Sequence, residues 1–528
     1  MNLPRETNKP FMAQQNLFSV DRSGQTYRWL VIVAGMLAFF TMVISSSTVN
    51  VAIPHVMGSF GVGQDKAQYL STSFLAATVT SLLLNSWFIA KFGQRTAFVS
   101  SLLLFCLGSV ISGFSPNLGL IIVGRVIQGF AAGIIQPLVM VLLFQFFPPE
   151  KRGSAMGMFS MGVVFALGLG PAIGGITIDN LHWRYIFLVP IPTTVMALVL
   201  GVLFMPERPR SGEPGPFDIL GYSLMCATVF CLMTIIGNGQ RLGWFSNDIM
   251  ALGAVMVAAG AGFVYSQRLP RSNLLDLSLF RNPRFVTAVT ISFLFGFVSF
   301  ATIYIFPVFA QIVQGYTATL AGSLLLPGSL AAAAFLPFSG RLADHFPPTA
   351  LILAGMIIFI YSTILMAGSD IDTVFWSIAL YLFIGRMGNA LVSPALMSTA
   401  MDALPASHLH QGAGTVNLCL MLGGSCGINA LVVVLERRIE FHGDAFAMTQ
   451  TSANPATREM LSSVRNLLGE GGIPDALRDG VALDYLNSIV AAQANTLGFQ
   501  DGFIAIAFVS AIAAVPVFLL TRKHRRPQ

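Results

Sequence analysis

Residues 119–133 read GLIIVGRVIQGFAAG and lie in a stretch, Thr96 to Pro149, whose only charged side chain is Arg125. A helix needs about 20 apolar residues to cross a bilayer, so this stretch is long enough for two spans. An arginine within a span costs about 3 kcal/mol on insertion scales and more than about 10 kcal/mol in simulations. The stretch therefore predicts a membrane bundle with a buried polar site around Arg125.

The rest of the chain has the same character. Of its 528 residues, 55% are hydrophobic and 10% are charged, whereas soluble domains carry about 25% charged residues. We predict an all-α polytopic membrane protein with fourteen spans. The predicted spans are 29–53, 69–90, 96–114, 118–142, 153–178, 184–205, 218–238, 247–266, 285–313, 318–338, 348–367, 373–398, 412–435 and 499–521.

The composition also argues against several classes of protein. The span 29–53 is too long for a signal-peptide core and lacks a small-residue cleavage pattern, so we expect it to remain in the mature chain. The five cysteines fall in apolar runs without metal-ligand spacing, and no catalytic set or phosphate-binding loop is legible. We expect no enzyme activity, metal or cofactor. The net charge of +6 does not imply nucleic acid, because in a membrane protein the location of the charge matters more.

Basic residues set the predicted orientation. With a cytoplasmic N-terminus, 19 of the 29 Lys and Arg lie in cytoplasmic segments, eight lie outside, and Arg125 and Arg386 lie within spans. Five of the outer eight belong to the long segment 436–498, and long loops count little in this rule. We therefore predict a multi-pass protein of the cytoplasmic (inner) membrane with both termini in the cytoplasm.

An internal repeat predicts the architecture. SWFIAKFGQR (86–95) is matched by GRLADHFPPT (340–349), and GRVIQG (124–129) by GRMGNA (385–390), at offsets of 254 and 261 residues. Two six-helix halves with two inserted helices follow, and such repeats are typical of transporters. The predicted parts are a tail at 1–28, a half at 29–210, inserted helices at 211–270, a half at 271–521 that includes the outer segment 436–498, and a basic tail at 522–528.

The outer segment 436–498 contains two stretches with helical spacing. One is EMLSSVRNLLGE (459–470), and the other carries Leu483, Leu486, Ile489 and Val490. These stretches fit a surface helix resting on the membrane or the bundle, or a docking site for an extracytoplasmic partner.

Several motifs together resemble the major facilitator superfamily. GRLAD (340–344) is similar to its loop signature, GRVIQG to its fourth-helix motif and GMFSMGVVFALGLGPAIGG (157–175) to its antiporter motif. Further stretches resemble the fourteen-span drug:proton antiporter subfamily. They are STVNVAIP (47–54), HWRYIFLVPIP (182–192), PFDILGYSL (216–224) and LLDLSLFRNPRF (274–285).

The resemblance implies two moving parts. Small residues that allow close helix packing and a helix-bending proline form an implied antiporter hinge, made of Gly157, Gly170, Pro171, Gly174 and Gly175. The loop signature implies a cytoplasmic latch, made of Gly340, Arg341, Asp344, Lys91, Gly93 and Arg95. Ser86 and Ala90 replace the glycine and aspartate of the pattern, so we expect the latch to be stronger in the C-terminal half.

The resemblance also sharpens the question of Arg125. The family places an acidic residue in the first span, but here the stretch is SSST (45–48), with Ser46 at that position. We therefore expect neutral acceptors around Arg125, namely Ser46, Asn50, Gln128 or backbone carbonyls, or else water or a bound molecule. Arg386 has Asn389 and Asn417 as candidate neighbours. These seven residues are the candidate substrate or coupling site; a structural role for both arginines is the alternative.

Three functions follow as hypotheses. The first is a secondary active exporter of amphipathic small molecules of the multidrug efflux type, working by alternating access and driven by protons. The second is an exporter of lipophilic organic anions or metabolites with unconventional proton coupling. The third is a transporter-like scaffold or sensor. The sequence leaves open whether a periplasmic adaptor and an outer-membrane channel continue the path.

Overall fold

The computed structural model describes residues 25–147, 152–207, 217–269, 274–275, 277–405 and 409–522. Within them, fourteen helices are long and apolar enough to cross a membrane, as predicted, and the described residues contain no strand. The predicted tail 1–28 is described only from residue 25, and 523–528 lie outside the described residues.

The N-terminal half contributes the first six spans. Its helices are α1 (Gln25–Phe60), α2 (Gln64–Ala67), α3 (Tyr69–Phe92), α4 (Gln94–Gly113), α5 (Leu118–Phe146), α6 (Arg152–Asn180), the 3-10 helix η2 (Trp183–Phe187) and α7 (Pro190–Phe204). Short local signals set several boundaries. Asn117 caps α5 by accepting a hydrogen bond from the Leu120 N–H at 2.9 Å, and Gly93 turns the chain between α3 and α4 with φ of 84°.

Two inserted helices and the C-terminal half follow. The inserted helices are α8 (Ile219–Leu242) and α9 (Asn247–Ser266), and the C-terminal half contains η3 (Leu277–Arg281), α10 (Pro283–Ile312), α11 (Ala318–Ser323), α12 (Leu325–His345), α13 (Pro348–Ala367), α14 (Phe375–Asp402), α15 (Leu409–Thr449), α16 (Pro455–Glu470) and α17 (Asp475–Arg522). α8 packs against α3 and α15, and α9 packs against α8. The inserted pair therefore covers one edge of the junction between the halves.

The second span of each half begins with a short separate helix. α2 is followed by α3 after Gln68, and α11 is followed by α12 after Leu324. The apolar pattern predicted uninterrupted spans over 69–90 and 318–338. The break at Gln68 precedes the first of these spans, which α3 forms without interruption, whereas the break at Leu324 falls within the second; the two breaks lie at corresponding places in the repeat.

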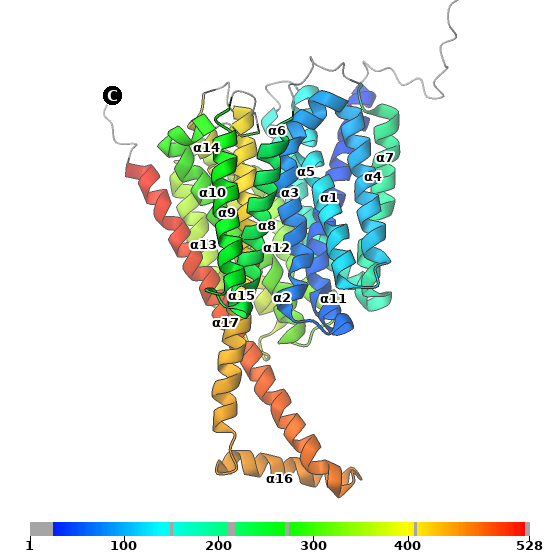
Figure 1. Ribbon diagram of the computed structural model, residues 1–528, viewed down its shortest axis with the longest axis vertical. Coiled ribbons are helices and arrows are strands. Elements are labelled where there is room, and N and C mark those ends of the chain that lie inside the picture. Colours follow the sequence, from blue (N-terminus) through cyan, green and yellow to red (C-terminus); the bar gives the residue numbers. More distant parts are fainter. Residues whose placement is uncertain are drawn as a thin grey trace, which may run out of the picture.

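The segment 436–498 is a helical projection rather than a loop with two helical stretches. α15 continues without interruption to Thr449, α16 crosses the tip, and α17 returns from Asp475 into the bundle. Figure 1 shows α16 held well away from the bundle. The sequence interpretation in which this helix rests on the bundle is therefore wrong. We call α16 with the outer parts of α15 and α17 the projection.

Ionic contacts fix the base and the tip of the projection. At the base, Asp501 of α17 accepts hydrogen bonds from Arg438 at 2.6 Å and pairs with His442 at 2.7 Å, both on α15. At the tip, Arg465 of α16 pairs with Asp479 of α17 at 2.9 Å. The projection is therefore connected side chain to side chain at its base and at its tip.

The halves meet mainly along four helix pairs. α1 packs against α10, α3 against α15, and α6 against both α11 and α12. The largest cluster of buried apolar residues includes side chains from both halves, such as Val51 and Phe74 from one and Tyr304 and Ile428 from the other. The junction between the halves is therefore a packed, largely apolar interface.

Candidate functional site

A small cavity lies at the junction of the two halves. Its ten lining residues come from α1, α3 and α6 on one side and from α10 and α15 on the other, and its volume is about 20 Å³. A cavity of that volume holds about one water molecule, so the halves are nearly closed around it. The lining residues are Ser46, Ser47, Asn50, Ser71, Phe74, Leu75, Leu167, Phe300, Ile303 and Ile428.

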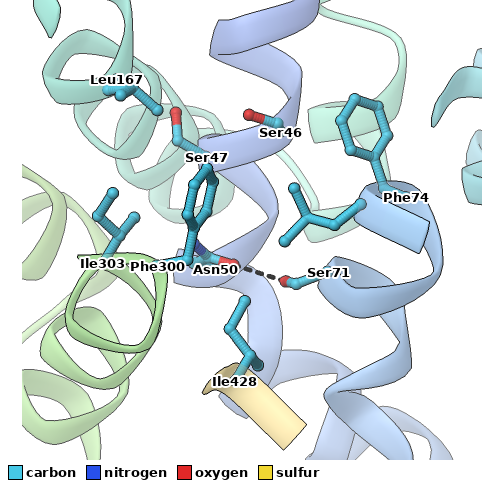
Figure 2. A pocket seen from close by; sticks show the side chains of 10 residues that line it. Ser46, Ser47, Asn50, Ser71, Phe74, Leu167, Phe300, Ile303 and Ile428 are labelled. Carbon is cyan, nitrogen blue, oxygen red and sulfur yellow. Dashed lines mark hydrogen bonds between the residues drawn. The ribbon is translucent and has the colours of Figure 1, made fainter. Parts of the chain in front are cut away.

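Polar groups occupy one part of the cavity wall and apolar groups the rest. Ser71 donates a hydrogen bond to the Asn50 side-chain oxygen at 2.6 Å, joining α3 to α1 (Figure 2). Ser46 donates to the Val43 carbonyl at 2.7 Å within its own helix, which leaves its lone pairs available as acceptors. No lining residue is charged. The wall can therefore accommodate a neutral molecule with both apolar and hydrogen-bonding parts.

Arg125 is held by neutral groups, as its surroundings in the sequence require. Its Nε donates to the Leu70 carbonyl at 2.8 Å, and its Nη1 donates to Gln128 at 2.9 Å. Nη1 also lies 3.4 Å from the Ser45 carbonyl. Gln128 in turn donates to Ser109 at 2.8 Å. A chain of hydrogen bonds thus links α1, α3, α4 and α5 within the N-terminal half.

Two predicted neighbours of Arg125 are replaced by others. Ser46 and Asn50 bond within α1 and to α3, and it is the adjacent Ser45 that contacts the guanidinium. Ser45 and Ser46 differ by about 100° around the helix axis, so they face different neighbours. The arginine site and the cavity therefore lie on different faces of α1.

Phe74 separates the guanidinium from the cavity. Its ring centroid lies 4.3 Å from the Arg125 guanidinium carbon, a cation–π distance, and Phe74 also lines the cavity. Arg125 itself is fully buried and is absent from the lining. Its Nη2 has no hydrogen-bond partner among the described residues. The positive charge thus lies behind an aromatic wall rather than in the cavity.

Arg386 of α14 is not gathered into this site. Its side chain packs against Gly328 of α12, and among the described side chains it forms no hydrogen bond with Asn389 or Asn417. The Asn389 side-chain oxygen is buried without a partner in the described part of the chain. The predicted polar cluster of the C-terminal half is therefore not assembled in this state.

Glycines of α6 bring the two halves into backbone contact. A Cβ at Gly175 would overlap the Ala318 carbonyl of α11, and one at Gly322 of α11 would overlap the Pro171 carbonyl of α6. On the other face of α6, Gly170 and Gly174 pack against α1. α6 therefore lies between the halves with side-chain-free surfaces on two faces.

The family model of the "Major Facilitator Superfamily" matches residues 35–428. The chain belongs to the major facilitator superfamily. Its fourteen spans and its similarity to named multidrug exporters fit the fourteen-span drug exporter type within the superfamily.

Three curated relatives match over most of their lengths. The uncharacterized MFS-type transporter YhcA of Bacillus subtilis is 28% identical over 93% of this chain and 92% of its own. The fatty acid resistance protein FarB of Neisseria gonorrhoeae is 26% identical over 94% and 97%. The multidrug export protein EmrB of Escherichia coli K12 is 28% identical over 83% and 86%. The superfamily relatives are transporters rather than enzymes.

A solved structure supports the fold. A bacterial homologue of the human lysosomal transporter Spinster, in an inward-facing and unoccupied conformation, aligns with a TM-score of 0.62 at 15% identity. The alignment covers 94% of this chain and 98% of that one. It establishes the shared superfamily fold for both halves.

The superfamily's loop motifs lie at the end of the bundle opposite the projection. Arg95 pairs with Glu207, which follows α7, and the Lys91 amine lies 4.6 Å from the Trp87 ring centroid, so both contacts stay inside the N-terminal half. Gly340 and Arg341 lie near the end of α12. The Asp344 side chain and the surroundings of Gly157 lie outside what the structure describes, so the latch stays a prediction.

Ser71, Phe74, Phe300, Ile303 and Ile428 line the cavity but were not singled out in the sequence. Each belongs to an apolar span. Hydropathy does not show which side chains of a span face the other half, or at what depth in the bundle they lie. A buried guanidinium favours an aromatic face, and this general rule was the one signal that pointed to an aromatic neighbour such as Phe74.

Proposed function

We propose that this protein is a secondary active exporter of amphipathic small molecules, driven by the proton gradient and working by alternating access. The observation that carries the proposal is the cavity between the halves, whose wall joins serine and asparagine groups to phenylalanine and aliphatic groups. Recognition of that kind suits molecules with an apolar body and a few hydrogen-bonding groups.

Alternating access is supported by how the halves touch. The reciprocal contacts of Gly175 with Ala318 and of Gly322 with Pro171 allow two helices to approach at backbone distance and to separate without disentangling side chains. Binding sites at the interface of two repeats that rock against each other are typical of secondary transporters. A scaffold or sensor would not need this interface.

We further propose that neutral and anionic amphiphiles are exported in preference to cations. No carboxylate lines the cavity, and the nearest buried charge described beside its wall is the positive Arg125 behind Phe74. A permanent cation would therefore lose hydration without gaining a counter-charge. The name of the fatty acid resistance protein FarB favours organic anions, because fatty acids are anionic amphiphiles.

Transport in reconstituted vesicles with an imposed proton gradient tests this proposal. The substrates would be three amphiphiles of similar size and apolar area that are neutral, anionic or permanently cationic. We expect gradient-dependent export of the neutral and anionic compounds. Strong export of the cation alone would contradict the charge preference, and export without a gradient would contradict proton coupling.

We also propose the predicted orientation, with both termini cytoplasmic and the projection outside, and an extracytoplasmic adaptor as its partner. Four apolar residues spaced four apart on the outer part of α17, Leu477, Val481, Tyr485 and Ile489, are exposed, and side chains so spaced form one ridge. Cross-linking from a cysteine at Val481 in whole cells would test for the adaptor; the absence of any adduct, with a labelled control at Ser488, would contradict it.

A further inference from the structure

We propose that Asp179 and Glu436 together form an outer latch between the halves, and that Glu436 accepts the proton that weakens it in the transport cycle. The inference rests on the proposed proton coupling, for which the first span supplies no carboxylate. Both side chains reach across the junction at the end of the bundle that carries the projection, where Figure 1 also places α2 and α11.

Asp179, near the end of α6, bonds to the C-terminal half. Its carboxylate oxygens accept hydrogen bonds from the Thr319 N–H at 2.8 Å and the Ala318 N–H at 3.3 Å, both at the start of α11. One ionised side chain of the first half thus holds two backbone groups of the second.

Glu436 of α15 makes the converse contact. Its Oε1 accepts a hydrogen bond from the Asp65 N–H at 2.7 Å, in α2 of the N-terminal half. Hydrogen bonds to an ionised acceptor are about twice as strong as those between neutral groups. One carboxylate therefore reaches from the N-terminal half to the C-terminal half, and the other reaches from the C-terminal half to the N-terminal half.

The two contacts occupy equivalent places in the internal repeat. Glu436 follows Asp179 by 257 residues (436 minus 179), and Thr319 follows Asp65 by 254 (319 minus 65), close to the motif offsets of 254 and 261. In each half the donor lies in the short helix that precedes the break in the second span. The latch thus follows the pseudo-symmetry of the fold.

Charged and titratable neighbours differ between the two sites. Around Glu436 lie Asp65 of α2, Arg241 of α8, Tyr304 of α10 and Glu440 of α15, and Arg241 lies 3.9 Å from Asp65. Around Asp179, the titratable neighbour among the described residues is His55 of α1. Arg184, which follows Asp179 in the chain, stacks on Trp183 and Phe60 instead.

Protonation weakens both contacts in the same sense. Binding a proton converts each carboxylate into a neutral carboxyl group, which is a weaker acceptor for the backbone N–H. The latch is therefore complete when both groups are ionised. Asp179 accepts hydrogen bonds from two backbone N–H groups, which favour its ionised form. Glu436 accepts one and has Asp65 and Glu440 beside it, so it gains a proton first as the outside pH falls. The remaining hydrogen bonds between the halves that the structure describes are neutral, from Gln311 to the Val51 carbonyl and from Ser425 to the Thr72 carbonyl. Protons arriving from outside would thus open the outer end.

Cysteine accessibility measures this opening without substrate or gradient. Ile303 lines the cavity and is 6% exposed, so an Ile303→Cys variant with the five native cysteines replaced reports entry from outside. Right-side-out vesicles are treated with an impermeant maleimide, and the rate is divided by that of Ser488→Cys on the projection, which corrects for thiol ionisation. We expect the ratio to rise about tenfold between about pH 8 and about pH 5, a change of about 1.4 kcal/mol.

Neutral variants should mimic the protonated state. With Asp179→Asn and Glu436→Gln together, we expect a high labelling ratio at every pH, whereas Glu459→Gln, exposed on α16 of the projection, should behave as the parent. A double variant that keeps the parent's pH dependence, or a parent without one, would overturn the latch. Because substrate is absent, a wrong substrate class would leave these results unchanged and would appear only in the transport assay.

Discussion

At the scale of single residues, Arg125 is held by neutral hydrogen-bond acceptors and has no counter-charge among the described residues. Its Nε and Nη1 are used by Leu70, Ser45 and Gln128, and Phe74 covers its face. The planar guanidinium of arginine, whose N–H donors point in fixed directions, matches this arrangement, and the ammonium group of lysine does not. The arginine therefore joins four helices and places a positive charge behind the wall of the cavity.

Arg125→Lys should impair both stability and transport. The lysine leaves the Leu70 carbonyl or Gln128 without a donor, which costs about 1–3 kcal/mol. The measurement is the thermal unfolding midpoint in detergent together with export in vesicles. Arg458→Lys, at an exposed position on α16, is the control and should match the parent; equal behaviour of the two variants would show that the guanidinium geometry is unimportant.

Ser46→Asp should reverse the charge preference of export. The new carboxylate would face the cavity, and a charge pair about 4 Å apart gains about 4 kcal/mol at an effective dielectric constant of about 20. We expect cationic amphiphiles to become substrates and anions to be exported more slowly. Ser46→Asn has a similar size without charge and should leave the preference unchanged. Identical substrate profiles for both variants would contradict the assignment of the cavity as the substrate site.

At the scale of elements, α6 decides how closely the halves approach. Gly175 touches the C-terminal half, while Gly170 and Gly174 touch α1, so the same helix packs tightly on the half it belongs to and on the half it moves against. Small residues allow such contacts because they let backbones approach.

Gly175→Ala should hinder closure of the halves at α11. The added Cβ meets a backbone carbonyl that cannot rotate away, and overpacking of this kind costs about 1–3 kcal/mol. Export should fall while membrane insertion stays normal. Gly253→Ala on α9 is a matched control because its Cβ would have no neighbour within 4 Å. Unchanged export by Gly175→Ala would mean that this contact is not part of the cycle.

The spans could be predicted because hydrophobicity over about 20 residues is a strong and local signal. Three features could not. The break at Leu324 falls inside the apolar pattern of 318–338, which runs through it without a signal. The projection is helical where its composition is polar. Which of Ser45 and Ser46 meets Arg125 depends on the rotation of α1 in the bundle, and hydropathy does not record that rotation.

At the scale of the whole molecule, the two halves are joined differently at their two ends. At the end with the projection, Asp179 and Glu436 bond across the junction. At the other end, Arg95 and Lys91 make their described contacts within one half. With the projection outside, this arrangement is a state whose outer end is fastened.

Labelling of introduced cysteines should show this orientation. Ser452→Cys and Ser488→Cys, both exposed on the projection, should react with an impermeant reagent added to intact cells. His345→Cys, exposed at the end of α12, should react only after the membrane is permeabilised, as should a cysteine at Ser211. Reaction of His345→Cys alone in intact cells would reverse the topology.

The unbroken course of α15 gives the projection a mechanical meaning. This helix runs for 41 residues from inside the bundle to the tip, a length of about 60 Å. A stiff rod converts a small rotation at one end into a large displacement at the other, and a tilt of about 15° about its middle would carry the tip about 8 Å. The position of the tip therefore reports the orientation of the C-terminal half, and a partner bound to α16 would be displaced in each transport cycle.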